Sequence, residues 1–146
     1  MNIDNESREL AYYRLTLLAF LKESHPEKVN DTTFISVRAE IASQAYSDAI
    51  DNGFAIPLAV EMANVALFEG LHFSKHDTLI NIIWNEFSDD VPQGDAKAFA
   101  EKILPICEKV FEKYPLSDDF SYSPEYEQLY TELTGTVQIY LEENVI

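Results

Sequence analysis

The sequence predicts an all-α protein that folds as a single irregular bundle of about six helices. Apolar residues recur at helical spacing along almost the whole chain, and no stretch shows several cycles of the alternating pattern that is typical of strands. The four glycines fall at the ends of these periodic segments or interrupt them. Because a chain of 146 residues fits one core, we expect a single domain over residues 1–146.

The first two helices are expected over residues 5–24 and from residue 30 or 31 to residue 52. His25 precedes Pro26 and is therefore disfavoured in α-helical geometry, which ends the first helix. Asn30 or Asp31 can cap the second helix, and Asn52-Gly53 provides a left-handed end. The side chains expected to face inward are Leu10, Tyr13, Leu17, Leu18 and Leu21 in the first helix and Phe34, Val37, Ile41, Ala45 and Ile50 in the second.

The third and fourth helices are expected over residues 56–69 and 74–87. Pro57 suits a first helical turn, and the third helix is apolar around most of its circumference, which predicts a central position in the bundle. Ser74 with Asp77 three residues later resembles a capping box that starts the fourth helix. Its expected inward stripe is Leu79, Ile80, Ile83, Trp84 and Phe87.

The fifth helix is expected from a cap at Asp95 to about residue 114, and the sixth from Ser123-Pro124 to about residue 141. Pro105 lies inside the fifth helical pattern and should kink the helix or split it. Gly135 weakens the middle of the sixth helix. The inward side chains expected are Phe99, Ile103, Ile106 and Val110 in the fifth helix and Tyr126, Leu129, Leu133, Val137, Tyr140 and Leu141 in the sixth.

Charge and composition exclude several classes of function. The chain carries 26 acidic and 10 basic residues, for a formal net charge of −16, which disfavours direct binding to nucleic acid or to anionic membranes. The N-terminal residues are acidic, unlike a signal peptide, and no apolar stretch approaches the length of a membrane span. Only one cysteine is present, so we expect a cytoplasmic protein without an intrachain disulfide.

No catalytic, nucleotide-binding or cofactor-binding motif is found, and the weak candidates for a metal site are His72 and His76. Their spacing of four would suit a metal on a continuous helix, but Gly70 and Ser74 place a helix break between them. The alternative is that both histidines make hydrogen bonds near the helix start. Cys107 lacks a reactive motif and is expected to be buried and inert.

Tyrosines are more numerous than one helical core usually needs, and several follow residue 120. Partly exposed aromatic side chains often anchor protein–protein interfaces. The candidate interface residues are Tyr122, Tyr126, Tyr130 and Tyr140. The alternative is that their rings pack in the core and their hydroxyl groups reach water.

Two stretches carry a resemblance to a known family: residues 12–27 (YYRLTLLAFLKESHPE) and residues 70–87 (GLHFSKHDTLINIIWNEF). They resemble an uncharacterised family of small acidic proteins, a domain of unknown function, that occurs in Bacteroidetes and is often associated with conjugative or mobilisable elements. The resemblance implies a bacterial setting and a link to DNA transfer. It implies no activity, cofactor or catalytic residue.

Three classes of function remain open after these exclusions. The leading hypothesis is a non-catalytic adaptor or regulator that binds a basic protein partner through aromatic anchors and an acidic rim, with homo-oligomerisation as a further option. The second is a DNA mimic whose carboxylates imitate phosphates and block a DNA-binding or restriction protein. The third is an enzyme or metal protein centred on His72 and His76.

Overall fold

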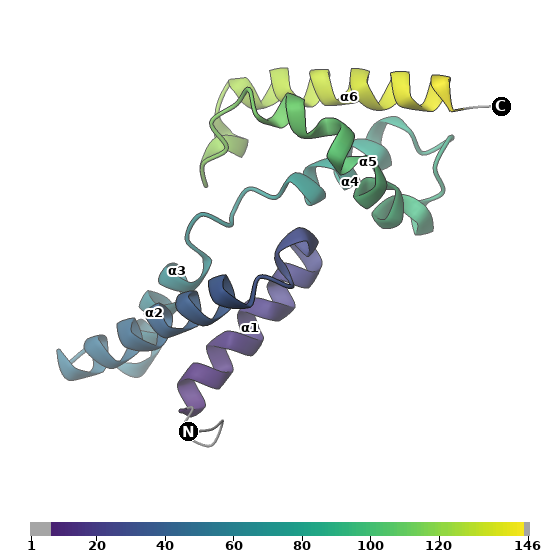
Figure 1. Cartoon of the computed structure of the whole chain (residues 1–146). Coiled ribbons are helices and arrows are strands. Elements are labelled where there is room, and N and C mark those ends of the chain that lie inside the picture. Colours follow the sequence, from purple (N-terminus) through teal and green to yellow (C-terminus); the bar gives the residue numbers. More distant parts are fainter. Residues whose placement is uncertain (1–6, 145–146) are drawn as a thin grey trace. The chain divides into compact units, whose positions relative to one another are not determined.

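The computed structural model describes residues 7–144, and within this range every regular element is helical. The all-α prediction is confirmed, and six α-helices are present in the described part of the chain (Figure 1). They are α1 (Arg8–Ser24), α2 (Thr32–Asp51), α3 (Ile56–Phe68), α4 (Lys75–Glu86), α5 (Ala96–Phe111) and α6 (Glu125–Glu143). Three short 3-10 helices lie between them: η2 (Pro26–Lys28), η3 (Gln93–Asp95) and η4 (Phe120–Tyr122). Among the described helices, none is both long and apolar enough to cross a lipid bilayer.

The helix ends follow local side-chain chemistry at several positions. The side chain of Asp31 accepts a hydrogen bond from the amide of Phe34, and that of Ser74 accepts one from the amide of Asp77. Both caps confirm the predictions. The expected start of the first helix at residue 5 lies outside the described residues, and Ser7 caps the described helix.

The other two predicted caps do not form the expected side-chain hydrogen bonds, although Asp95 directly precedes α5 as predicted. The side chain of Asp95 caps no amide, because its backbone (φ −100°, ψ −2°) is not in the extended geometry that directs a capping side chain back to the helix. Ser123 instead donates its hydroxyl hydrogen to the carbonyl of Phe120 at 2.8 Å, within the turn that precedes α6. Pro105 does not split the fifth helix, since α5 continues through it to Phe111.

The chain forms two compact units, Met1–Leu71 and His72–Ile146. Each has its own cluster of buried apolar side chains, whereas the sequence predicts a single core. The assignment of residues 1–146 to one domain stays a prediction. Cooperative unfolding of both units would support it.

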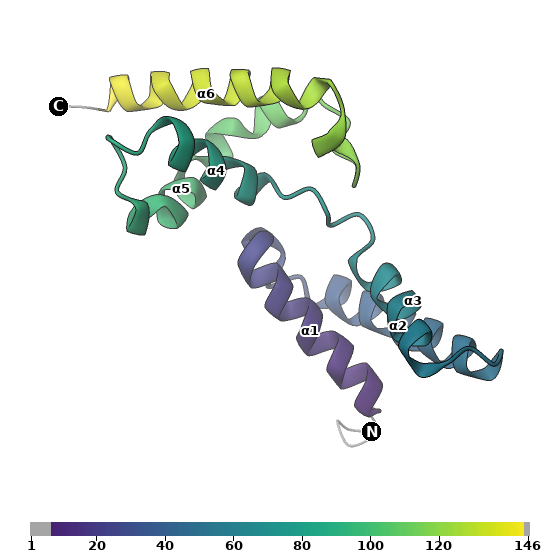
Figure 2. The ribbon, with the colours of Figure 1, turned by 180° about the vertical axis from the view of Figure 1, so that it is seen from behind.

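The first unit is built around α2, which packs against both α1 and α3; Figures 1 and 2 show α2 and α3 side by side. From α1, the predicted stripe supplies the buried side chains of Tyr13, Leu17 and Leu21. From α2 and α3, mostly alanines face inward: Ala39, Ala42, Ala49, Ala59 and Ala63, with Ile35 and Leu67. Small side chains at these positions allow the helices to approach closely.

This alanine interface overturns the predicted inward face of α2 and the predicted central position of α3. Val37, Ile41 and Ile50 are exposed, because the face that carries the alanines is the one that contacts α1 and α3. Only Ala59, Ala63 and Leu67 of α3 are fully buried, so most of its large apolar side chains lie at the surface.

The second unit contains α4, α5 and α6, with α5 packed against α4 and α6. Its core agrees with the prediction for most positions, and Phe111, Phe120, Leu129 and Leu133 are among its largest fully buried side chains. Two side chains expected to face inward, Trp84 and Ile106, are exposed instead. Ile82, two positions before Trp84, and Cys107, directly after Ile106, are buried in their helices.

Candidate functional site

His72 and His76 lie in different environments at the start of the second unit. His72 is exposed, its backbone amide donates to Asp118 at 3.0 Å, and its Nε2 lies 3.9 Å from a carboxylate oxygen of the same residue. His76 is 1% exposed, and neither of its ring nitrogens has a hydrogen-bond partner. The expectation that His76 makes a hydrogen bond is therefore wrong, because its position in the first turn of α4 turns the ring into the core.

The surroundings of these histidines do not form a cluster of metal ligands. Within residues 7–144, no group of three or more His, Cys, Asp or Glu side chains is placed to hold a metal ion. Structural zinc sites use four protein ligands and catalytic sites usually three. Among the described residues, His72 and His76 are therefore not accompanied by the further ligands that either kind of site uses.

The four candidate interface tyrosines divide into one exposed and three packed residues. Tyr122 is 90% exposed. Tyr126 and Tyr140 pack partly against the core of the second unit, with the Tyr140 ring 5.9 Å from that of Phe99. Tyr130 donates its hydroxyl hydrogen to Glu86 at 3.0 Å. The sequence cannot separate these cases, because all four lie on or near one helix and their exposure depends on packing.

Two internal hydrogen bonds engage Glu132, near the middle of α6. Lys113 and Tyr114 both donate hydrogen bonds to the carboxylate of Glu132. The bond to Glu132 raises the pKa of Tyr114 to about 12, and the bonds from Lys113 and Tyr114 lower the pKa of Glu132. A carboxylate held ionised in this way joins α6 to the end of α5 and does not resemble a general acid.

Cys107 is buried, as predicted. Burial raises the pKa of its thiol to about 11, with a smaller contribution from the nearby Glu108 carboxylate. A thiol with a raised pKa is almost entirely protonated at neutral pH and reacts poorly as a nucleophile.

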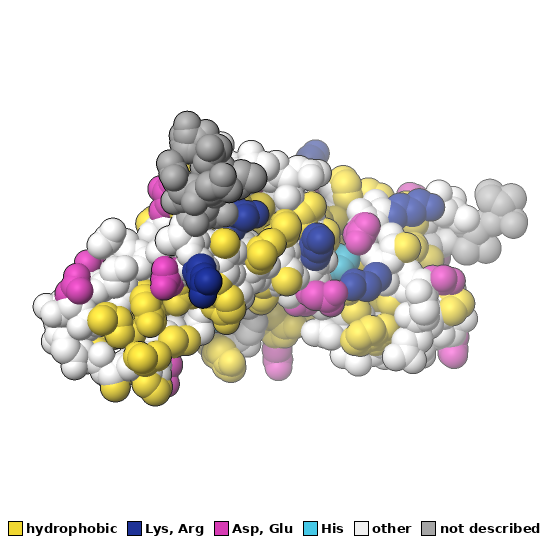
Figure 3. Space-filling view, turned by 90° about the horizontal axis from the view of Figure 1, so that it is seen from below, with side chains coloured by type: hydrophobic (Ala, Val, Ile, Leu, Met, Phe, Trp, Pro, Cys, Tyr) yellow, Lys and Arg dark blue, Asp and Glu magenta, His cyan; other side chains and the backbone are white. Residues whose placement is uncertain are grey.

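The feature that the sequence analysis missed is an apolar surface on the first unit. Eight of the large apolar side chains exposed on the molecule belong to the hairpin of α2 and α3: Val37, Ile41, Ile50, Phe54, Ile56, Leu58, Met62 and Val65. Figure 3 shows hydrophobic side chains gathered toward this part of the molecule. Exposed apolar groups that gather in this way commonly mark binding surfaces.

One row within this surface runs along α3, and we call it the α3 stripe: Leu58, Met62 and Val65. These residues are spaced by four and three positions, so their side chains lie on one face of the helix. They are 43%, 39% and 72% exposed, respectively. The apolar composition of α3 is visible in the sequence, but only packing shows which part of it is left uncovered.

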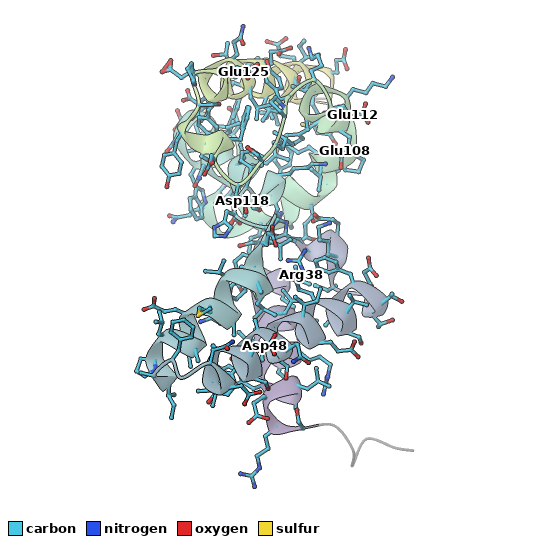
Figure 4. The ribbon with its side chains drawn as sticks, turned by 90° about the vertical axis from the view of Figure 1, so that its left-hand side faces the viewer. Arg38, Asp48, Glu108, Glu112, Asp118 and Glu125 are labelled. Atoms are coloured by element: carbon cyan, nitrogen blue, oxygen red, sulfur yellow. The ribbon has the colours of Figure 1, made fainter. Side chains whose placement is uncertain are left out.

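Polar contacts hold the C-terminal end of α3 in place beside this surface. Nη1 of Arg38, labelled in Figure 4, donates from α2 to the carbonyl oxygens of Leu67 and Glu69, at 3.1 and 2.6 Å. The Arg38 guanidinium also lies over the ring of Phe34, 4.9 Å from its centroid. Cations are favoured at helix C-termini, so Arg38 fixes the position of the α3 end.

A buried histidine makes a second contact to the same segment. Nε2 of His25 lies 2.9 Å from the carbonyl oxygen of Leu71, and its Nδ1 lies 3.7 Å from the carboxylate of Glu27. His25 and Arg38 therefore both hold residues 67–71 against the rest of the first unit. These contacts span 29 to 46 positions in sequence, and no local pattern predicts them.

Comparisons with known proteins agree with this description of the fold. A family model described as "Domain of unknown function (DUF1896)" matches residues 5–146. The crystal structure of protein PG0816 from Porphyromonas gingivalis is similar at a TM-score of 0.91 and 43% sequence identity, covering 97% of this chain and 96% of that one. No curated protein matches the chain. The source of the solved structure fits the Bacteroidetes origin that the resemblance implied.

Proposed function

The chain belongs to the DUF1896 family of domains of unknown function, and we propose that it is a non-catalytic protein that binds a basic protein partner. The observation that carries the proposal is the α3 stripe, an exposed apolar row on a helix that holds no Lys or Arg. Burying such a row against a partner removes apolar area from water, which is the main favourable term in protein association.

The charge of the chain supports a basic partner in particular. No Lys or Arg lies between Arg38 and Lys75, whereas five carboxylates do: Glu40, Asp48, Asp51, Glu61 and Glu69. Carboxylates around an apolar centre attract a basic surface and raise its association rate. The exposed Tyr122 is a second contact candidate in this proposal, on the other unit.

The setting that we propose is the bacterial cytoplasm. The single, buried cysteine supports it, since a thiol without a disulfide partner suits a reducing compartment. On the basis of the sequence resemblance, we also propose a role in conjugative or mobilisable elements. Genomic neighbours that encode DNA-transfer proteins would support that role.

Affinity capture from the native cell lysate tests the proposal. The bound proteins are identified by mass spectrometry at low and at high salt, and each candidate is then purified and its affinity measured. We expect a specific basic protein that binds more weakly as salt rises. If no purified candidate binds, the proposed function is wrong. If duplex DNA competes for the partner's site, the protein acts as a DNA mimic instead.

A further inference from the structure

Resting on the proposed function, we infer that the α3 stripe binds an amphipathic α-helix of the partner that carries Lys or Arg beside its apolar face. The stripe has the spacing by which an exposed helix face receives a second helix, with Val65, its most exposed member, toward the C-terminal end. A partner helix packed here would cover Leu58, Met62 and Val65 together.

Two carboxylates beside the α3 stripe indicate that the partner's helix carries basic side chains. Glu61 lies three positions after Leu58 and four before Val65, and Glu69 lies four positions after Val65, so both flank the stripe. Both are exposed, and neither forms an ion pair with another described residue. The nearby cation is Arg38, whose Nη1 already donates to the carbonyl oxygens at the α3 end.

The same charges argue against a second copy of the chain as the occupant. Helices packed stripe against stripe would bring Glu61 and Glu69 of both copies together, with no Lys or Arg on α3 to compensate. Like charges placed together at an interface oppose binding. A partner helix that carries Lys or Arg would instead be attracted to Glu61 and Glu69, and it would bury the same apolar area.

The probe for this inference is a synthetic amphipathic helix of about five turns, with Leu on one face and Lys on its flanks. A second probe has Glu in place of every Lys. Binding of labelled peptide to the full chain is measured by fluorescence anisotropy over a range of salt. We expect the Lys peptide to bind and the Glu peptide not to bind.

Variants of the chain locate the contact. Val65→Gln and Leu58→Gln remove apolar contacts from the stripe, and we expect each to weaken Lys-peptide binding by about tenfold. Ile139→Gln is the matched control, because Ile139 is an exposed (56%) apolar residue on a helix of the other unit, and we expect no change. Glu61→Gln should reduce the salt dependence of binding, whereas the exposed Glu127→Gln on α6 should leave it unchanged.

Three results would overturn the inference. The first is a Lys peptide that does not bind, and the second is equal weakening by Val65→Gln and Ile139→Gln. The third is a concentration-dependent dimer that Val65→Gln abolishes, which would assign the stripe to a second copy. A captured natural partner that binds wild type and Val65→Gln equally would leave the proposed function intact and refute the α3 stripe as its site.

Discussion

Replacing Arg38 by methionine removes two hydrogen bonds from a charged donor to the C-terminal end of α3. Methionine keeps much of the apolar stem beside Phe34 but cannot donate to the carbonyl oxygens of Leu67 and Glu69. The Arg38→Met variant therefore isolates the contribution of the guanidinium from that of packing. The change is confined to the first unit.

The expected loss in the free energy of unfolding depends on how exposed the two Arg38 hydrogen bonds are. Hydrogen bonds to charged groups contribute about 1.5–3 kcal/mol each, and water replaces the exposed bond to Glu69 more readily than the half-buried bond to Leu67. The cation–π contact with Phe34 adds about 0.5 kcal/mol at a partly exposed site. We expect Arg38→Met to lower the free energy of unfolding by about 2–3 kcal/mol in total.

Denaturant unfolding followed by circular dichroism measures this change, and amide hydrogen exchange locates it. Exchange should become faster in α3 and at residues 67–71. The matched control is Lys22→Met, which removes an exposed cation in the last turn of α1 and should cost less than about 0.5 kcal/mol. Equal stability of Arg38→Met and Lys22→Met would refute the role given to Arg38.

The same experiment tests the assignment of the chain to one domain. If the two units unfold together, Arg38→Met lowers the unfolding midpoint of both, although every contact it removes lies in the first. Exchange that becomes faster in the first unit alone would show that the units unfold separately.

Three further predictions concern single residues. The Cys107 thiol, with its pKa raised to about 11, should react with iodoacetamide at about pH 8 far more slowly in the folded chain than in denaturant; equal rates would contradict its burial. His76→Leu should raise the free energy of unfolding by about 1 kcal/mol, since it removes buried ring nitrogens that lack partners; a clear loss of stability would show that the ring makes a favourable polar contact. For Glu27, burial alone would raise the pKa, but the His25 ring, 3.7 Å away, and nearby groups lower it from 4.5. The carboxylate therefore stabilises the fold above pH 4.5, and the stability difference between wild type and Glu27→Gln should shrink as the pH falls below that value.

Much of the helical framework follows from neighbouring residues in the sequence. The end of α1 before Pro26 and the caps at Asp31 and Ser74 were all predicted, because each depends on backbone geometry or on a side chain three positions away. The buried position of Cys107 was also predictable, since it lies beside the apolar stripe of its helix.

The candidate surface was only partly predictable. The apolar character of α3 is plain in the sequence, but it predicted a central helix rather than an exposed stripe. The tyrosines near α6 were candidates for an interface, yet Tyr126, Tyr130 and Tyr140 pack against their own unit. Composition shows how apolar a helix is, and it does not show how many neighbours the helix has.

Packing between helices determines which face of each helix is covered and which distant residues meet. On α2, alanines face α1 and α3 while Val37 and Ile41 remain exposed, because close helix packing favours small side chains over larger apolar ones at the contact. Arg38 contacts the carbonyl oxygen of Leu67, 29 positions away, because the packing of α2 against α3 brings the two residues together. Local interactions therefore set the end of α1 and the starts of α2 and α4, whereas long-range packing sets the surface that the helices present.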